Sequence, residues 1–197
     1  MFYENINIIN NPDNIDILVN KNNKLSNNYI PCDLDPISSD YTIGMQYLRK
    51  EAKYYFEKMC VKAKEDGYKL FAVSTFRSSD YQDKLYKKYC LDKGIEYANM
   101  CSARKGHSEH QTGLAVDVSD IFGEYDDFAN TKEFEWMMDN AYKYGFILRY
   151  PKYKTDITGF KYEPWHYRYI GIDMAKYLYN NNLTLEEYYL INKKKAH

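Results

Sequence analysis

The sequence predicts a single α+β domain, with a small antiparallel or mixed sheet and flanking helices, over residues 1–197. Segments with helical spacing of apolar residues are mixed irregularly with short apolar runs typical of strands, which favours α+β over a strictly alternating α/β fold. A chain of this length buries one sizeable core, and no repeat or linker divides it. With 27 basic against 28 acidic residues, it lacks the basic excess of nucleic-acid-binding proteins.

The first elements follow from composition and spacing. Residues 1–40 are rich in Asn, Asp and Pro and are expected to form an extended N-terminal arm, with one short strand at the apolar island 15–19. A helix is predicted over residues 44–66, because apolar residues recur there every three or four positions and Gly67 provides a stop. The apolar run 69–74 predicts a buried strand.

A second helix is predicted to start near Ser79, whose spacing to Gln82 fits a capping box, and to end by Gly94. Residues 95–112 are polar and turn-rich and are expected to be a loop. The apolar run 114–118 predicts the next strand.

The remaining elements are a helix over 131–144, a strand over 146–150 and an aromatic strand over 162–170. Two short helices are expected after them, the last opening with a capping box formed by Thr184 and Glu187. Residues 191–197 are expected to be a disordered tail.

The sequence shows no stretch near the roughly 20 apolar residues of a membrane helix. Its first twenty residues also lack the basic start and apolar segment of a secretory signal. The protein is therefore expected to be cytoplasmic, and the alternative is an exported or membrane-anchored protein whose anchor is absent from this sequence. Four cysteines form no C-x-x-C pair: Cys32, Cys60, Cys90 and Cys101. Their even number allows two disulfides, but without a secretory signal they are expected to be free thiols. No feature of the sequence sets the oligomeric state.

Asp117 stands in the otherwise apolar run 114–118. Burying an ionised carboxylate costs several kcal/mol unless a cation compensates it, so Asp117 predicts a positively charged partner. His110 lies just upstream and can return through a turn at Gly113 to share a metal ion with it. On spacing alone, a structural Asp bonded to backbone amides remains the alternative.

A second pair of polar residues, Glu163 and His166, lies in an aromatic segment. Glu163 precedes Pro164 and is disfavoured in the helical region, so the segment is expected to be extended. In a plain strand, positions three apart face opposite ways, and a turn or bulge at Pro164 is needed to aim both groups at one metal. A Glu and a His on a half-buried strand are the alternative.

Together the two segments complete the three-ligand set of a catalytic zinc site, which leaves one coordination position open: His110, Asp117 and His166. Glu163 then supplies the general base that metal-assisted hydrolysis requires. Two competing assignments remain at this point, with His107 in place of His110 as ligand and Glu109 in place of Glu163 as base.

These residues lie in blocks that resemble the VanY and VanXY type of zinc D,D-carboxypeptidases and D,D-dipeptidases. The blocks come in the family's order and span about half of the chain: residues 74–78 with Gln82, residues 102–117, residues 144–151, and residues 157–159 with 163–169. The resemblance implies one zinc ion on the same three ligands, held in a cleft, with Glu163 as the base.

The resemblance also implies further site residues. Arg77 is expected to steady the scissile carbonyl as it becomes an oxyanion, lowering the barrier by a few kcal/mol. Ser102 and Gln82 are expected to contact the terminal carboxylate of the substrate, with Trp165 also in the substrate site. Lys105 departs from the family, which often has Pro there, and this departure concerns the shape of the loop rather than the metal.

The expected function is hydrolysis of the terminal D-Ala from peptidoglycan precursor peptides by a zinc D,D-carboxypeptidase, to which D,D-dipeptidase activity can be added. Such an enzyme is linked to glycopeptide (vancomycin) resistance or to cell-wall metabolism. The alternatives are an L,D-carboxypeptidase or a cell-wall endopeptidase on the same scaffold, and a catalytically silent muropeptide-binding module. An intact Glu163 with a full ligand set argues against the silent module.

Overall fold

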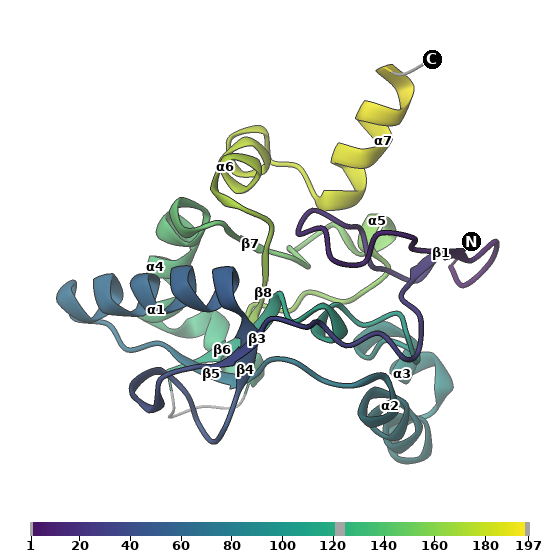
Figure 1. Cartoon of the computed structure of the whole chain (residues 1–197), viewed down its shortest axis with the longest axis horizontal. Coiled ribbons are helices and arrows are strands. Elements are labelled where there is room, and N and C mark those ends of the chain that lie inside the picture. Colours follow the sequence, from purple (N-terminus) through teal and green to yellow (C-terminus); the bar gives the residue numbers. More distant parts are fainter. Residues whose placement is uncertain (1, 121–124, 196–197) are drawn as a thin grey trace.

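A computed structural model describes residues 2–120 and 125–195. Its centre is a four-stranded sheet in the order β5-β6-β8-β7, in which all neighbours are antiparallel (Figure 1). The strands are β5 (Phe71–Ser74), β6 (Ala115–Ser119), β7 (Phe146–Leu148) and β8 (His166–Tyr169). The predicted α+β class and all four of these strands are confirmed.

Helices cover one face of this sheet. The two main ones are α1 (Lys50–Glu65) and α4 (Lys132–Asn140), which share one apolar core with the sheet. Side chains alternate along a strand, so Val116 and Tyr167 enter this core while Asp117 and His166 point to the opposite face. The central strands β6 and β8 therefore separate a buried apolar layer from a polar one.

The arm is extended, as expected, but its strands are not where the sequence placed them. It forms short pairs, β1 (Asn7–Ile8) with β2 (Asn23–Lys24), and β3 (Leu34–Pro36) with β4 (Tyr47–Arg49). The strand predicted at 15–19 is wrong, because Ile17 and Val19 are buried in a small apolar cluster without pairing in a ladder. The first helix starts at Lys50 rather than residue 44, because β4 pairs with β3 before it.

The second helix is α2 (Ser79–Lys93), and its N-cap is Ser78 rather than the predicted Ser79. The Ser78 hydroxyl accepts a hydrogen bond from the Tyr81 amide at 3.2 Å. The loop expected over residues 95–112 is partly wrong, since it contains α3 (Ile95–Cys101) and the 3-10 helix η2 (Glu109–Thr112). The η2 turn consists of four polar residues and shows no apolar periodicity, whereas α3 is only seven residues long.

The third helix is shorter than predicted, because α4 ends at Asn140 and the 3-10 helix η4 (Ala141–Tyr144) follows. The other short elements are η1 (Ser39–Tyr41), η3 (Tyr125–Asn130) and α5 (Thr155–Thr158). The chain closes with α6 (Ile172–Asn181) and α7 (Leu185–Lys195), which projects from the body (Figure 1).

The capping box predicted for the last helix is confirmed. The Thr184 amide donates to Glu187 Oε2 at 2.8 Å, and the Glu187 amide donates to the Thr184 hydroxyl at 3.2 Å. The tail expected to be disordered from residue 191 is corrected as far as Lys195, because α7 continues to that residue. Residues 196 and 197 lie outside the described residues.

All four cysteines are free thiols, as predicted. Within residues 2–120 and 125–195, no helix has both the length and the apolar character needed to span a bilayer.

Candidate metal centre

A cleft of about 620 Å³ opens on the polar side of the sheet. All the site residues proposed from the sequence line it: Arg77, Gln82, Ser102, His110, Asp117, Glu163, Trp165 and His166. Asp117 and His166 stand on β6 and β8, and Arg77 and Gln82 lie just before and in the first turn of α2. Ser102 caps the end of α3, His110 lies in η2, and Glu163 and Trp165 precede β8. Segments far apart in the sequence therefore converge on one cavity.

Asp117 and His166 are direct cross-strand partners on β6 and β8. Asp117 Oδ1 lies 2.9 Å from His166 Nδ1, and Asp117 Oδ2 lies 3.3 Å from His110 Nε2. One ligand atom from each of these three buried residues lies within 4.8 Å of the others. The predicted ligand set is brought together by the fold.

His110 reaches this position because the chain reverses at Gly113. This residue adopts the left-handed region with φ of +66°, which favours glycine. A Cβ atom there would approach Leu34 Cδ2 to 2.7 Å, so the turn has no room for a side chain. The reversal leads η2 directly into β6 and places His110 beside Asp117.

The pKa values of the two imidazoles are shifted in opposite directions. Burial, with Arg77 nearby, lowers the pKa of His110 to about 4, and its Nδ1 donates to the Thr75 carbonyl at 2.6 Å, which leaves Nε2 unprotonated toward Asp117. Burial also acts to lower the pKa of His166, but hydrogen bonds to Asp117 and Glu109 outweigh it and raise this pKa to about 9.

Asp117 is ionised despite its burial. Burial opposes the charge, but the facing His110 and His166 imidazoles hold the pKa of the carboxyl well below its usual range. A buried carboxylate with two imidazole nitrogens around it forms the donor set of a catalytic zinc site with one open position. The residues present therefore fit zinc.

Glu163 enters the same cleft through a turn. Residues 164 and 165 form the turn, and the His166 amide donates to the Glu163 carbonyl at 3.2 Å. The turn or bulge predicted at Pro164, which is needed to aim Glu163 and His166 at one metal, is therefore present. Burial, with a contribution from Asp117, raises the pKa of Glu163 to about 8, opposed by His166. A carboxyl group with a pKa near neutrality is suited to taking up and releasing a proton.

Arg77 places its guanidinium beside the ligands. Its NH1 donates to the Ser74 hydroxyl at 2.8 Å and lies 3.6 Å from Asp117 Oδ2. Its Nε is buried and has no hydrogen-bond partner among the described residues. A buried donor without a protein acceptor is expected to be satisfied by a ligand or by water.

Gln82 and Ser102 form a pair, and their geometry separates their roles. Gln82 Nε2 donates to the Ser102 hydroxyl at 3.1 Å and to the Ala103 carbonyl at 2.9 Å. Because a carbonyl only accepts, the amide orientation of Gln82 is determined, and Oε1 is left buried without a partner in the described chain. Gln82 thus presents an acceptor, whereas the Ser102 hydroxyl keeps a proton to donate. This geometry favours Ser102 over Gln82 as the direct contact for a carboxylate.

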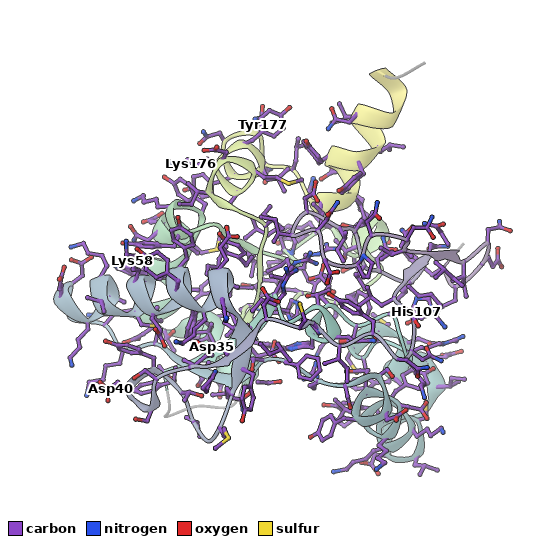
Figure 2. All side chains as sticks on the ribbon, viewed as in Figure 1. Asp35, Asp40, Lys58, His107, Lys176 and Tyr177 are labelled. Carbon is purple, nitrogen blue, oxygen red and sulfur yellow. The ribbon has the colours of Figure 1, made fainter. Side chains whose placement is uncertain are left out.

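The residues of the two competing assignments are engaged with other partners. His107 Nδ1 lies 2.9 Å from the Asn20 carbonyl and its ring meets the edge of Tyr3, so it faces the N-terminal arm (Figure 2). Glu109 is fully buried between Arg149 and Arg168, which lie 2.8 and 2.9 Å from its Oε1. Burial opposes its ionisation, but these guanidinium groups hold the pKa of Glu109 well below its usual range. Glu109 is thus a fixed charge rather than a proton-transfer group.

The fold also brings in a residue that sequence reasoning missed. The Tyr150 ring stacks on the His166 imidazole, with centroids 4.9 Å apart and an angle of 21° between the planes. Tyr150 closes the predicted strand 146–150, and nothing in its local pattern distinguishes it from a core aromatic residue.

Comparison with known proteins identifies relatives. A model of the family described as VanY, D-alanyl-D-alanine carboxypeptidase, matches residues 45–172. The bifunctional D-Ala-D-Ala dipeptidase and D-Ala-D-Ala carboxypeptidase VanXYC of Enterococcus gallinarum is 34% identical over 177 residues, which cover 87% of this chain and 92% of that protein.

Solved structures agree with these matches. The LdcB LD-carboxypeptidase, whose structure was described for peptidoglycan recognition, superposes with a TM-score of 0.88 at 44% identity over 94% of this chain and 90% of that chain. A mutant of the vancomycin resistance D,D-pentapeptidase VanY, in complex with Zn(II), has a TM-score of 0.76 at 32% identity over 88% of this chain and 98% of that chain.

Proposed function

This chain belongs to the VanY family of D-alanyl-D-alanine carboxypeptidases, and on that premise we propose that it is a zinc peptidase releasing the terminal D-Ala of peptidoglycan peptides. The observation that carries the proposal is the convergence of three metal-binding side chains and Glu163 on one cleft, next to the guanidinium of Arg77. The Zn(II) complex of the similar VanY structure supports zinc as the metal.

His110, Asp117 and His166 would hold the zinc ion. Zinc in such a site supplies Lewis-acid chemistry, lowering the pKa of water toward about 7 and polarising a carbonyl oxygen. The carboxylate of Glu163 takes a proton from the attacking water and passes it to the amine that leaves.

Arg77 acts on the charge that develops during the reaction. As the scissile carbonyl becomes tetrahedral, negative charge grows on its oxygen, and a guanidinium donor already fixed beside the ligands stabilises it without reorganisation. The guanidinium of Arg77 lines the cleft beside Asp117, and its Nε has no partner among the described residues, so the group has donor capacity for such an oxygen.

Exopeptidase action requires recognition of the free carboxylate of the substrate. Ser102 is positioned for this role, because Gln82 occupies a lone pair of its hydroxyl and leaves the proton for the carboxylate. Trp165, which also lines the cleft, provides an apolar surface for the peptide.

Two specificities fit this site, and each has support. The family model and the VanXYC relative favour D,D-cleavage of pentapeptides, with dipeptide cleavage as the form that accompanies glycopeptide resistance. The greater similarity to LdcB, at 44% identity, favours L,D-cleavage of tetrapeptides, a cell-wall maintenance function.

The test is detection of D-Ala release by mass spectrometry from D-Ala-D-Ala, UDP-MurNAc-pentapeptide and UDP-MurNAc-tetrapeptide, with chelator and with zinc added back. If D-Ala is released from the pentapeptide and the chelator abolishes this release, the protein is a D,D-carboxypeptidase. Cleavage of the D-Ala-D-Ala dipeptide as well would favour the resistance function. Release from the tetrapeptide alone would establish L,D specificity. A protein that holds zinc but releases D-Ala from none of them would contradict the proposal and favour an endopeptidase or a binding module.

A further inference from the structure

Both metal-binding histidines have their second ring nitrogen occupied, but by different partners. For His110 the partner is the backbone carbonyl of Thr75, 2.6 Å from Nδ1. For His166 the partner is the carboxylate of Glu109, whose Oε2 lies 3.4 Å from Nε2. The other nitrogen of His166, Nδ1, faces Asp117. The two imidazoles are therefore presented to the metal position by opposite nitrogens, Nε2 from His110 and Nδ1 from His166.

The orientation of the Glu109 carboxylate is fixed by the hydrogen bonds that its other oxygen, Oε1, accepts. Its Oε1 accepts from Arg149 Nε at 2.8 Å and from Arg168 NH1 at 2.9 Å, and all three side chains are fully buried. With two guanidinium groups on one oxygen, the second oxygen remains a charged acceptor directed at His166. A carboxylate that accepts from the distal nitrogen of a ligating histidine sets its tautomer and orientation.

We propose that Glu109 is a positioning residue for the metal ligand His166, accepting a hydrogen bond from its Nε2–H so that Nδ1 is the nitrogen that binds the zinc ion beside Asp117. This inference rests on the zinc site of the proposed function. It assigns a role to a residue that neither binds metal nor transfers a proton.

The contacts around Glu109 extend to the N-terminal arm and to α7. Arg149 pairs with Glu186 of α7 through two hydrogen bonds of 2.7 and 2.8 Å, and Glu186 accepts from Asn20 of the arm at 3.2 Å. Arg168 NH2 donates to the carbonyls of residues 15 and 17 at 2.9 and 3.0 Å. These contacts fix the two arginines and thereby the carboxylate of Glu109.

The sharpest test is Glu109→Gln, which keeps the shape and removes the charge. The two arginines can only donate, so they retain the amide oxygen, and the amide nitrogen is then directed at His166 Nε2. Two donors cannot face each other, so His166 is driven to carry its proton on Nδ1, where the metal binds. We expect the zinc dissociation constant to rise by about ten- to a hundredfold, the cost typical of losing an outer-shell partner.

Glu186→Gln is the matched control. It removes one negative charge from the same arginine pair but leaves the contact between Glu109 and His166 in place. We expect this variant to be less stable to urea than the wild type, with a zinc affinity that is nearly unchanged in chelator-competition titration. Equal losses of affinity in the two variants would show that only the charge of the cluster matters and would overturn the proposal.

The tautomers can be read directly in the zinc-loaded wild type by two-bond ¹H–¹⁵N correlation spectra of labelled histidine, which stays informative even if Glu109→Gln fails to fold. We expect an Nε2–H tautomer for His166 and an Nδ1–H tautomer for His110. An Nδ1–H tautomer of His166, or wild-type zinc affinity in a folded Glu109→Gln variant, would overturn the inference. A wild-type protein that binds no zinc would instead contradict the proposed function.

Discussion

The amide of His166 donates to the carbonyl of Glu163 at 3.2 Å, which closes a turn between two functional residues three positions apart. In an extended strand their side chains would point to opposite faces of the sheet. The turn directs both into one cleft, His166 as a metal ligand and Glu163 as the group for proton transfer. Because the backbone makes this link, the side chain of Glu163 can be replaced without moving the ligand.

Glu163→Gln should therefore separate metal binding from turnover. We expect kcat to fall by about 10²- to 10⁴-fold, because the variant cannot accept a proton from water. Zinc content, measured by atomic absorption, should stay at one ion per chain. Turnover close to that of the wild type would mean that another group is the base.

Zinc should stabilise the folded protein, because the unfolded chain does not hold the three ligands together. At a free zinc concentration of 100 times the dissociation constant, the free energy of unfolding should rise by about 2.7 kcal/mol. The measurement is urea unfolding with and without zinc. His110→Ala should lose most of this increment, whereas His107→Ala, which alters a contact with the arm, should keep it. Loss of the increment in His107→Ala instead would reverse the ligand assignment.

Arg77→Lys should lower kcat more than it changes KM. The lysine keeps the positive charge but loses the Nε donor, and removing a donor to a developing oxyanion costs about 10²- to 10³-fold in kcat. Steady-state kinetics on the preferred peptide would give kcat and KM separately. Measuring the zinc content of the variant would show that the metal site is intact. A rise in KM at constant kcat would place Arg77 in ground-state binding instead.

Ser102→Ala should show the opposite kinetic pattern. A hydrogen bond to a charged group contributes about 1.5–3 kcal/mol, so losing it should raise KM by about ten- to a hundredfold with little change in kcat. Gln82→Leu leaves the hydroxyl in place and removes only the group that orients it, so its KM should rise less. If Gln82→Leu were the more damaging variant, the carboxylate contact would belong to Gln82.

The capping box of α7 should stabilise the fold in a pH-dependent way. Burial raises the pKa of Glu187, but its hydrogen bonds to Lys154 and Thr184 outweigh this and lower the pKa overall. The stabilisation is then present above the unfolded pKa of about 4.3 and is lost as the pH falls through the folded pKa.

The comparison of wild type with Glu187→Gln isolates this contribution. At pH 7 the free energy of unfolding of the variant should be about 0.5–1 kcal/mol lower than that of the wild type, a range typical of a helix cap. This difference should decrease toward zero in acid. The measurement is urea unfolding at several pH values. A difference that stays constant into acid would assign the effect to packing rather than to charge.

Spacing proposed the metal ligands and Glu163 because each pair is local, and the family resemblance selected them over His107 and Glu109. His110 and Asp117 lie on either side of one glycine turn, Glu163 and His166 on either side of one proline turn, and an Asp in an apolar strand needs a cation. Their positions in one cleft confirm the placement, while their catalytic roles and the cytoplasmic location stay predictions.

The remaining features depend on contacts between distant segments. Glu109, Arg149 and Arg168 each occur singly in segments of ordinary composition, and only the fold shows that they form one buried cluster. The early start predicted for the first helix has a different cause. Met45 and Leu48 have helical spacing by coincidence, since Met45 is exposed at the rim of the cleft and Leu48 is buried by the pairing of β4.

The contact between Asn20 and Glu186 has a consequence for how the protein is made. These residues are 166 positions apart, and Arg168 is 153 positions from its acceptor at residue 15. At roughly 5–20 residues per second, about 8 to 33 s separate the synthesis of Asn20 from that of Glu186. During this time the N-terminal arm cannot form its contacts with Glu186, because that residue has not yet been synthesised. We expect the arginine pair, and the metal position next to it, to be completed last in co-translational folding.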